Sequence, residues 1–189
     1  MRRYRLAAAL FTLCCTANTK GQPMKAIEQK IKQTAHTELD WKVDEVRVDE
    51  VPELKRGPCT FYTAAHTVRP IPTQPNYAVL AGDTVIGSTD PAAVKKILAG
   101  CGADAPASWQ AEIVTRFDPS LGGVVLQDET KNGGAVRKLR SAGVTFSPPK
   151  LADKTLSFFM LEPEAFIISS VRAVRQPDGS VAVEKSPAK

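Results

Sequence analysis

The sequence predicts an α+β fold in which an antiparallel sheet is packed on one face by two to four helices. Some segments space their apolar residues three or four apart, as in a helix with one buried stripe. Others alternate apolar and polar residues and are bounded by turn residues, which is typical of strands. The predicted helices are 24–36, 91–99 and 106–117, and the sheet takes its strands from 39–51, 59–68, 77–87 and 155–185.

The first predicted helix, 24–36, carries Ile27 and Ile31 four residues apart, and a strand follows it over 39–51. Apolar residues alternate with polar ones along this strand, but the alternation slips by one residue at Asp44-Glu45, which predicts a β-bulge. The acids of the repeated VDEV sequence at 43–51 are interpreted as the solvated edge of a strand. A calcium-binding loop is not expected, because it would need a cluster of oxygen ligands with a glycine at its turn, and the sequence has none here.

The next two strands, 59–68 and 77–87, are separated by a segment rich in proline. Residues 69–75 contain three prolines and cannot join a regular ladder, because proline has no backbone N–H to donate. A stiff, extended connector is therefore expected. Within 77–87, Gly82-Asp83 predicts the turn of a short hairpin.

Two helices follow the hairpin. Pro91 suits the first position of the helix over 91–99, and Gly100 ends that helix. The helix over 106–117 repeats apolar residues at a spacing of four, at Trp109, Ile113 and Phe117.

The remainder of the chain returns to strands. Residues 124–126 form either a short buried strand or a continued helix, and 132–134 (Asn-Gly-Gly) break the chain. A short helix over 135–142 then ends at Gly143. The predicted terminal strands are 155–161, 165–175 and 180–185, with a turn at Gln176–Gly179 between the last two.

The first 17 residues have the order of a secretory signal peptide: three arginines, an uncharged run from Leu6 to Cys15, and small residues at Cys15 and Ala17. Cleavage after Ala17 and a periplasmic or secreted protein are expected. A lipoprotein anchor at Cys14 or Cys15 and a twin-arginine signal are minor alternatives, because the flanking residues fit them poorly.

The expected domain organisation is a flexible leader over 18–23, one α+β domain over 24–185 and a tail over 186–189. Loss of three arginines with the signal lowers the formal charge from +5 to +2, so no nucleic-acid partner is expected. No transmembrane segment is expected after cleavage, since no later apolar run is long enough. The oligomeric state is left open.

Two cysteines, Cys59 and Cys101, remain after signal cleavage. In an oxidising compartment they predict one disulfide, whereas a zinc site would need more ligands and a nucleophilic thiol would need an adjacent histidine. The link would join the start of the second strand to the end of the second helix.

The sequence carries no recognised catalytic, cofactor or metal motif. His66 is interpreted as a structural strand residue, and Glu162 and Glu164 as a polar turn. The sequence therefore predicts a non-catalytic protein without a cofactor that binds a protein or envelope macromolecule, as an assembly component or an inhibitor. The alternative is an envelope hydrolase that uses His66 with a serine or an acid.

Two surfaces are candidates for partner contact. The connector over 69–75 offers Arg69, Pro70, Pro72 and Pro75, whose fixed φ angles lower the entropy lost on binding. The helix over 135–142 offers the cations Arg137, Lys138 and Arg140, which would attract an acidic partner. A rigid connector and a solvated helix face are the alternatives.

The order of elements, a helix followed by antiparallel strands, is similar to cystatin-like cone architectures, in which a sheet curls around a helix. The similarity is architectural, and it implies nothing about function.

Overall fold

The protein forms an α+β fold with two antiparallel sheets, which confirms the predicted fold class. The predicted signal peptide, residues 1–17, and the first part of the predicted leader lie outside the described residues. The computed structural model describes residues 22–71, 74–81, 83–102, 104–163 and 165–188.

The described residues form four α-helices and nine strands. The helices are α1 (Gln22–Leu39), α2 (Ala93–Cys101), α3 (Ala107–Phe117) and α4 (Glu129–Ser141). The first sheet has the order β1 (Val46–Glu50), β2 (Thr60–His66), β3 (Asn76–Leu80), β4 (Thr84–Gly87). The second has the order β5 (Val124–Val125), β7 (Thr155–Glu162), β8 (Ile167–Arg175), β9 (Val181–Pro187), and β6 (Lys150–Ala152) also pairs with β7. All pairings are antiparallel.

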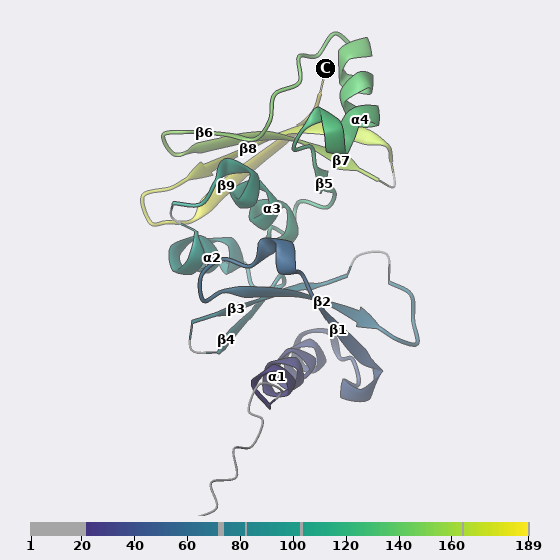
Figure 1. Ribbon diagram of the computed structural model, residues 1–189, viewed down its shortest axis with the longest axis vertical. Coiled ribbons are helices and arrows are strands. Elements are labelled where there is room, and N and C mark those ends of the chain that lie inside the picture. Colours follow the sequence, from purple (N-terminus) through teal and green to yellow (C-terminus); the bar gives the residue numbers. More distant parts are fainter. Residues whose placement is uncertain (1–21, 72–73, 82, 103, 164, 189) are drawn as a thin grey trace, which may run out of the picture.

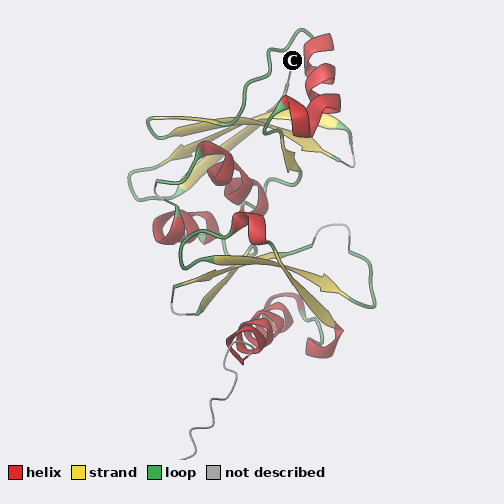
Figure 2. Ribbon diagram, in the orientation of Figure 1, coloured by secondary structure: helices red, strands yellow, loops and turns green. Residues whose placement is uncertain are grey.

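These elements stack in five layers (Figure 1; Figure 2). α1 lies on the outer face of the first sheet, α2 and α3 lie between the two sheets, and α4 lies on the outer face of the second sheet. The expectation of a single sheet with all helices on one face is therefore wrong. The reason is that α3 is buried on more than one side, including its polar residues Gln110 and Thr115, so it packs against both sheets.

The first sheet is covered on both faces. Ile31 and Ala35 of α1 pack against Tyr77 on one face, whereas Phe61 and Ile86 belong to the core that contains α2 and α3. α1 followed by a four-stranded meander has the helix-then-strands order of the cystatin-like comparison. That similarity extends only to this half of the chain, because the second sheet lies beyond it.

The segment predicted as a strand over 39–51 is different in the structure. α1 continues through Leu39, and a 3-10 turn at Val43–Glu45 replaces the predicted bulge before β1 begins. Asp40 adopts a left-handed backbone conformation with φ 55°, and its N–H donates to the carbonyl of His36. Leu39, Trp41 and Val43 therefore alternate with polar residues as in a strand, although they lie at the end of a helix and in the turn that follows it.

Two predicted hairpins are confirmed. β3 and β4 pair around residues 81–83, of which Asp83 has φ 77° and Gly82 lies outside the described residues. β8 and β9 pair across Gln176–Gly179, where Gly179 has φ 83° as its turn position requires.

The predicted break at 132–134 lies instead inside α4. This helix begins at Glu129 because the Asp128 carboxylate accepts a hydrogen bond from the Lys131 N–H at 2.7 Å. Asn132 has non-helical dihedral angles, and its Oδ1 accepts from the Gln127 N–H at 2.8 Å, which bends the helix without ending it.

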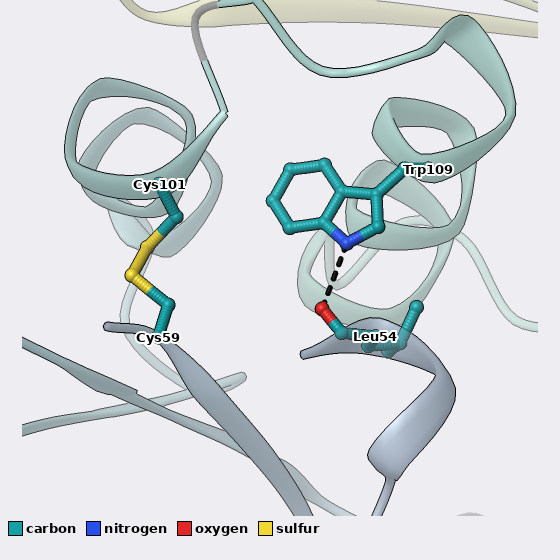
Figure 3. Close-up of a disulfide and its surroundings, with 4 residues drawn as sticks. All are labelled: Leu54, Cys59, Cys101 and Trp109. Atoms are coloured by element: carbon teal, nitrogen blue, oxygen red, sulfur yellow. Dashed lines mark hydrogen bonds between the residues drawn. A yellow bond between two sulfur atoms is a disulfide. The ribbon is translucent and has the colours of Figure 1, made fainter. Parts of the chain in front are cut away.

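The predicted disulfide between Cys59 and Cys101 is present and ties β2 to the end of α2 (Figure 3). Beside it, the Trp109 indole N–H donates to the Leu54 carbonyl at 2.8 Å (Figure 3). Gly102 allows this arrangement, because a Cβ at that position would lie 2.3 Å from the Trp109 ring. None of the described helices is both long and apolar enough to cross a membrane.

Candidate functional site: the groove beside the proline loop

The loop between β2 and β3, residues 67–75, is the candidate site that the proline pattern indicates, and we call it the proline loop. It extends from the right-hand end of the first sheet in Figure 1. Arg69 and Pro70 are exposed, Ile71 and Pro75 are half-buried, and Pro72 lies outside the described residues.

His66 fixes the start of the proline loop. Its Nδ1 accepts hydrogen bonds from the N–H groups of Val68 at 3.2 Å and Arg69 at 3.1 Å. Because Nδ1 is an acceptor, the proton of the neutral ring is on Nε2, which lies 3.3 Å from Glu45 Oε2. The side chain is only 6% exposed. The ring therefore serves as a cap for the loop backbone.

Trp41 is held against His66. The two rings meet edge to face with centroids 5.3 Å apart. The Trp41 carbonyl accepts a hydrogen bond from His36 Nδ1 at 2.8 Å, which joins the turn after α1 to the helix end. A half-buried aromatic ring is thus placed beside the proline loop by two local contacts.

The far end of the proline loop is also fixed. The Pro75 carbonyl accepts from the Ala64 N–H at 3.0 Å, which adds a backbone bond to β2. The Asn76 side-chain amide donates to the Arg116 carbonyl at 3.2 Å, and its backbone N–H donates to Ser88 Oγ at 3.1 Å. Both ends of the loop are therefore attached to the framework of the first sheet and α3.

A groove of about 410 Å³ lies between the proline loop, the end of α1 and the end of α3, and we call it the proline-loop groove. This volume falls in the range of ligand pockets, roughly 300–1,000 Å³. Six apolar residues and six polar residues line it. The apolar ones are Leu39, Trp41, Ile71, Pro75, Pro119 and Leu121, and the polar ones are Gln74, Asn76, Ser88, Thr89, Arg116 and Asp118.

The charges in the proline-loop groove are balanced. Arg116 Nε lies 3.4 Å from Glu112 Oε2, and Glu112 also accepts from Gln127 Nε2 at 2.8 Å. Asp118 Oδ1 accepts from the backbone N–H of Ser120 at 2.9 Å. Because Arg116 has an ion-pair partner and Asp118 already accepts hydrogen bonds from Ser120, the groove offers apolar contact and neutral hydrogen-bonding groups more than it offers charge.

The predicted basic face of α4 lies apart from the proline loop, on the outer side of the second sheet, and Arg137, Lys138 and Arg140 are all exposed there (Figure 1). Two of these cations have intramolecular partners: Lys138 donates to the Phe166 carbonyl, and Arg140 pairs with Glu129. The structure does not bring the two predicted surfaces together into one site.

The other residues considered for chemistry have structural contacts. Ser169 Oγ donates to Glu162 Oε1 at 2.7 Å, and Lys185 Nζ lies 3.3 Å from the same oxygen. The Ser169 hydrogen bond and the Lys185 charge hold the pKa of Glu162 below its usual range, which favours a carboxylate over a general acid. Glu164 lies outside the described residues.

No serine hydroxyl is hydrogen-bonded to His66 within the part of the chain that the structure describes. Across those same residues, no group of three or more His, Cys, Asp or Glu side chains is placed to hold a metal ion.

The residues that line the proline-loop groove opposite the loop were not identified as site residues from the sequence. Trp41 was interpreted as part of a strand, and Asn76, Arg116 and Leu121 carried no local signal. They are brought together by contacts between distant parts of the chain, such as the hydrogen bond from the Asn76 side-chain amide to the Arg116 carbonyl. No protein-family model, no curated protein and no solved structure matches this chain.

Proposed function

We propose that the protein is an exported, non-catalytic binding protein that takes an apolar segment of a partner protein into the proline-loop groove. The observation that carries this proposal is a groove of about 410 Å³. One of its walls is the proline loop, and intramolecular hydrogen bonds fix both ends of that loop in the free protein. Fixed walls lower the ordering entropy lost on binding. Such a role suits an envelope-assembly component or an inhibitor.

The chemistry of the lining indicates the kind of segment. Trp41, Ile71 and Leu121 offer apolar surface, which contributes about 25 cal/mol per Å² removed from water. Gln74 and Thr89 at the groove can pair with the backbone of an extended peptide. An uncharged peptide segment with aliphatic or aromatic side chains therefore fits the groove best.

Export rests on two observations. The arginine, apolar and small-residue order of residues 1–17 is that of a signal peptide. The disulfide between Cys59 and Cys101 is of the kind that persists in an oxidising compartment. We propose the periplasm or the extracellular space as the location.

The proposal is tested with a displayed library of random twelve-residue peptides selected against the purified protein. Enriched peptides should carry aliphatic or aromatic side chains. Their affinity should fall at least tenfold in Ile71→Lys, because that change places a charge against the groove wall. Val68→Lys is the matched control, since Val68 is on the same loop, is 67% exposed and does not line the groove.

The salt dependence separates this groove from the basic face of α4. Binding in the groove should change little between low and high salt, whereas binding through Arg137 would weaken because exposed charges are screened beyond about 8 Å at physiological salt. Enriched peptides that bind Ile71→Lys as tightly as the unchanged protein would refute the proposal.

A further inference from the structure

A second pocket lies in a different part of the molecule, between the α2–α3 layer and the second sheet. We propose that it binds a small amphiphile with a chain or ring of about six carbons and a carboxylate head group. None of its lining residues lines the proline-loop groove, so this site is independent of the proposed function.

The walls of the pocket are mostly apolar and come from both layers, with Gln110 of α3 as the buried polar residue among them. Leu98 of α2 and Val114 of α3 form one side, and Leu156 of β7 and Ala173 of β8 form the other. All four are buried members of the main core, so the pocket opens into the interior of the fold. An apolar surface of this kind favours a hydrocarbon group over water.

The volume of about 180 Å³ sets the size of the occupant. An engineered apolar cavity of about 150 Å³ in another protein binds benzene, which has six carbon atoms. A six-carbon chain or a single aromatic ring is therefore the group that this pocket can surround. A larger lipid chain would have to extend beyond it.

The mouth of the pocket supplies the charge preference. Lys154 and Arg175 line it together with the single acid Asp153. The Arg175 N–H donates to the Lys154 carbonyl at 2.9 Å, so Lys154, in the turn between β6 and β7, is held beside Arg175 at the end of β8. Neither cation takes part in the ion pairs formed among the described residues. The mouth therefore favours an anionic head group.

The pocket also has an accessible edge. Leu151 on β6 lines it and is 41% exposed. β6 forms only three residue pairs with β7, and all three of its residues are exposed. A ligand can therefore reach the apolar walls beside β6, between the second sheet and α3, without opening the disulfide-linked part of the fold.

Titration with hexanoate, followed by NMR of the Leu and Val methyl groups, tests the proposal. Saturable shifts are expected at Leu98, Val114 and Leu156 at millimolar concentrations. Hexanol probes the chain without the charge, and acetate probes the charge without the chain. We expect hexanoate to bind more tightly than hexanol, and acetate not to bind.

Variants separate the two parts of the site. The double change Lys154→Gln with Arg175→Gln should weaken hexanoate binding about five-fold, as expected for partly exposed ion pairs, and leave hexanol binding unchanged. The matched control is Lys150→Gln with Arg172→Gln, which removes two exposed cations that do not line the pocket.

Ala173→Leu should fill the pocket and abolish binding of both probes, and Val181→Phe at its edge should do the same if Ala173→Leu fails to fold. Three results would overturn the proposal. The first is that neither hexanoate nor hexanol causes saturable methyl shifts. The second is that the pocket-filling variants bind hexanoate as tightly as the unchanged protein does. The third is that the variant with both Lys154→Gln and Arg175→Gln binds hexanoate as tightly as the unchanged protein does.

Discussion

Removal of the disulfide should destabilise the protein by a large and calculable amount. Cys59 and Cys101 are 42 residues apart in the sequence, and closing a loop of this length removes chain entropy worth about 4 kcal/mol from the unfolded state. The double change Cys59→Ala with Cys101→Ala should lower the free energy of unfolding by this amount. For a protein of this size, the midpoint of thermal unfolding should fall by roughly 8–16 °C.

Urea unfolding monitored by circular dichroism measures the effect, and a reductant provides the control. Reduction should destabilise the unchanged protein by about as much as the double substitution does, but it should leave the double variant unaffected. Alanine is used because Cys59 is fully buried and a hydroxyl there would add a desolvation cost. A loss of less than about 1 kcal/mol in both experiments would refute the entropic account of this link.

Three further changes test the loop cap, an ion pair and a close packing contact. His66→Ala should lower the free energy of unfolding by about 2 kcal/mol in urea titrations, because it removes the acceptor for two backbone N–H groups. The pKa of Glu162 is lowered in the folded state, so its stabilising contribution exists above the ordinary glutamate pKa and is lost as the pH falls. As the pH is lowered from about 5 to about 3, the free energy of unfolding measured in urea titrations should therefore fall less for Glu162→Gln than for the unchanged protein. Gly102→Ala should cost about 1–3 kcal/mol in thermal unfolding because its Cβ would meet the Trp109 ring, whereas Gly122→Ala, with open space around it, should be close to neutral.

Much of the fold could be predicted because the signals were local. Gly179 requires positive φ in a turn, and its hairpin is present as expected. The disulfide followed from the number of cysteines left after the predicted signal. The division into two sheets could not be predicted, because it depends on α3 being buried on more than one side. Two of its buried residues, Gln110 and Thr115, are polar, so the spacing of apolar residues gives no sign that they are buried.

The candidate site was predictable only in part. Proline spacing identified the loop over 69–75, but the groove beside it depends on side chains from distant parts of the chain. Trp41 lines the groove because the chain turns at Asp40, where φ is 55°. The alternation of apolar and polar residues over 39–43 predicted a strand instead of this turn. Local patterns indicate elements, whereas the groove arises from the packing between them.

The central claim is that the proline-loop groove receives an apolar peptide segment, and Trp41 reports on it directly. The protein has two tryptophans, so Trp109→Phe leaves Trp41 as the only indole fluorophore. Titration of this variant with a library-selected peptide that lacks tryptophan should shift the Trp41 emission to shorter wavelength, because the peptide removes water from the ring. Adding Ile71→Lys should abolish the shift. An unchanged Trp41 emission while calorimetry records binding of the same peptide would contradict the account.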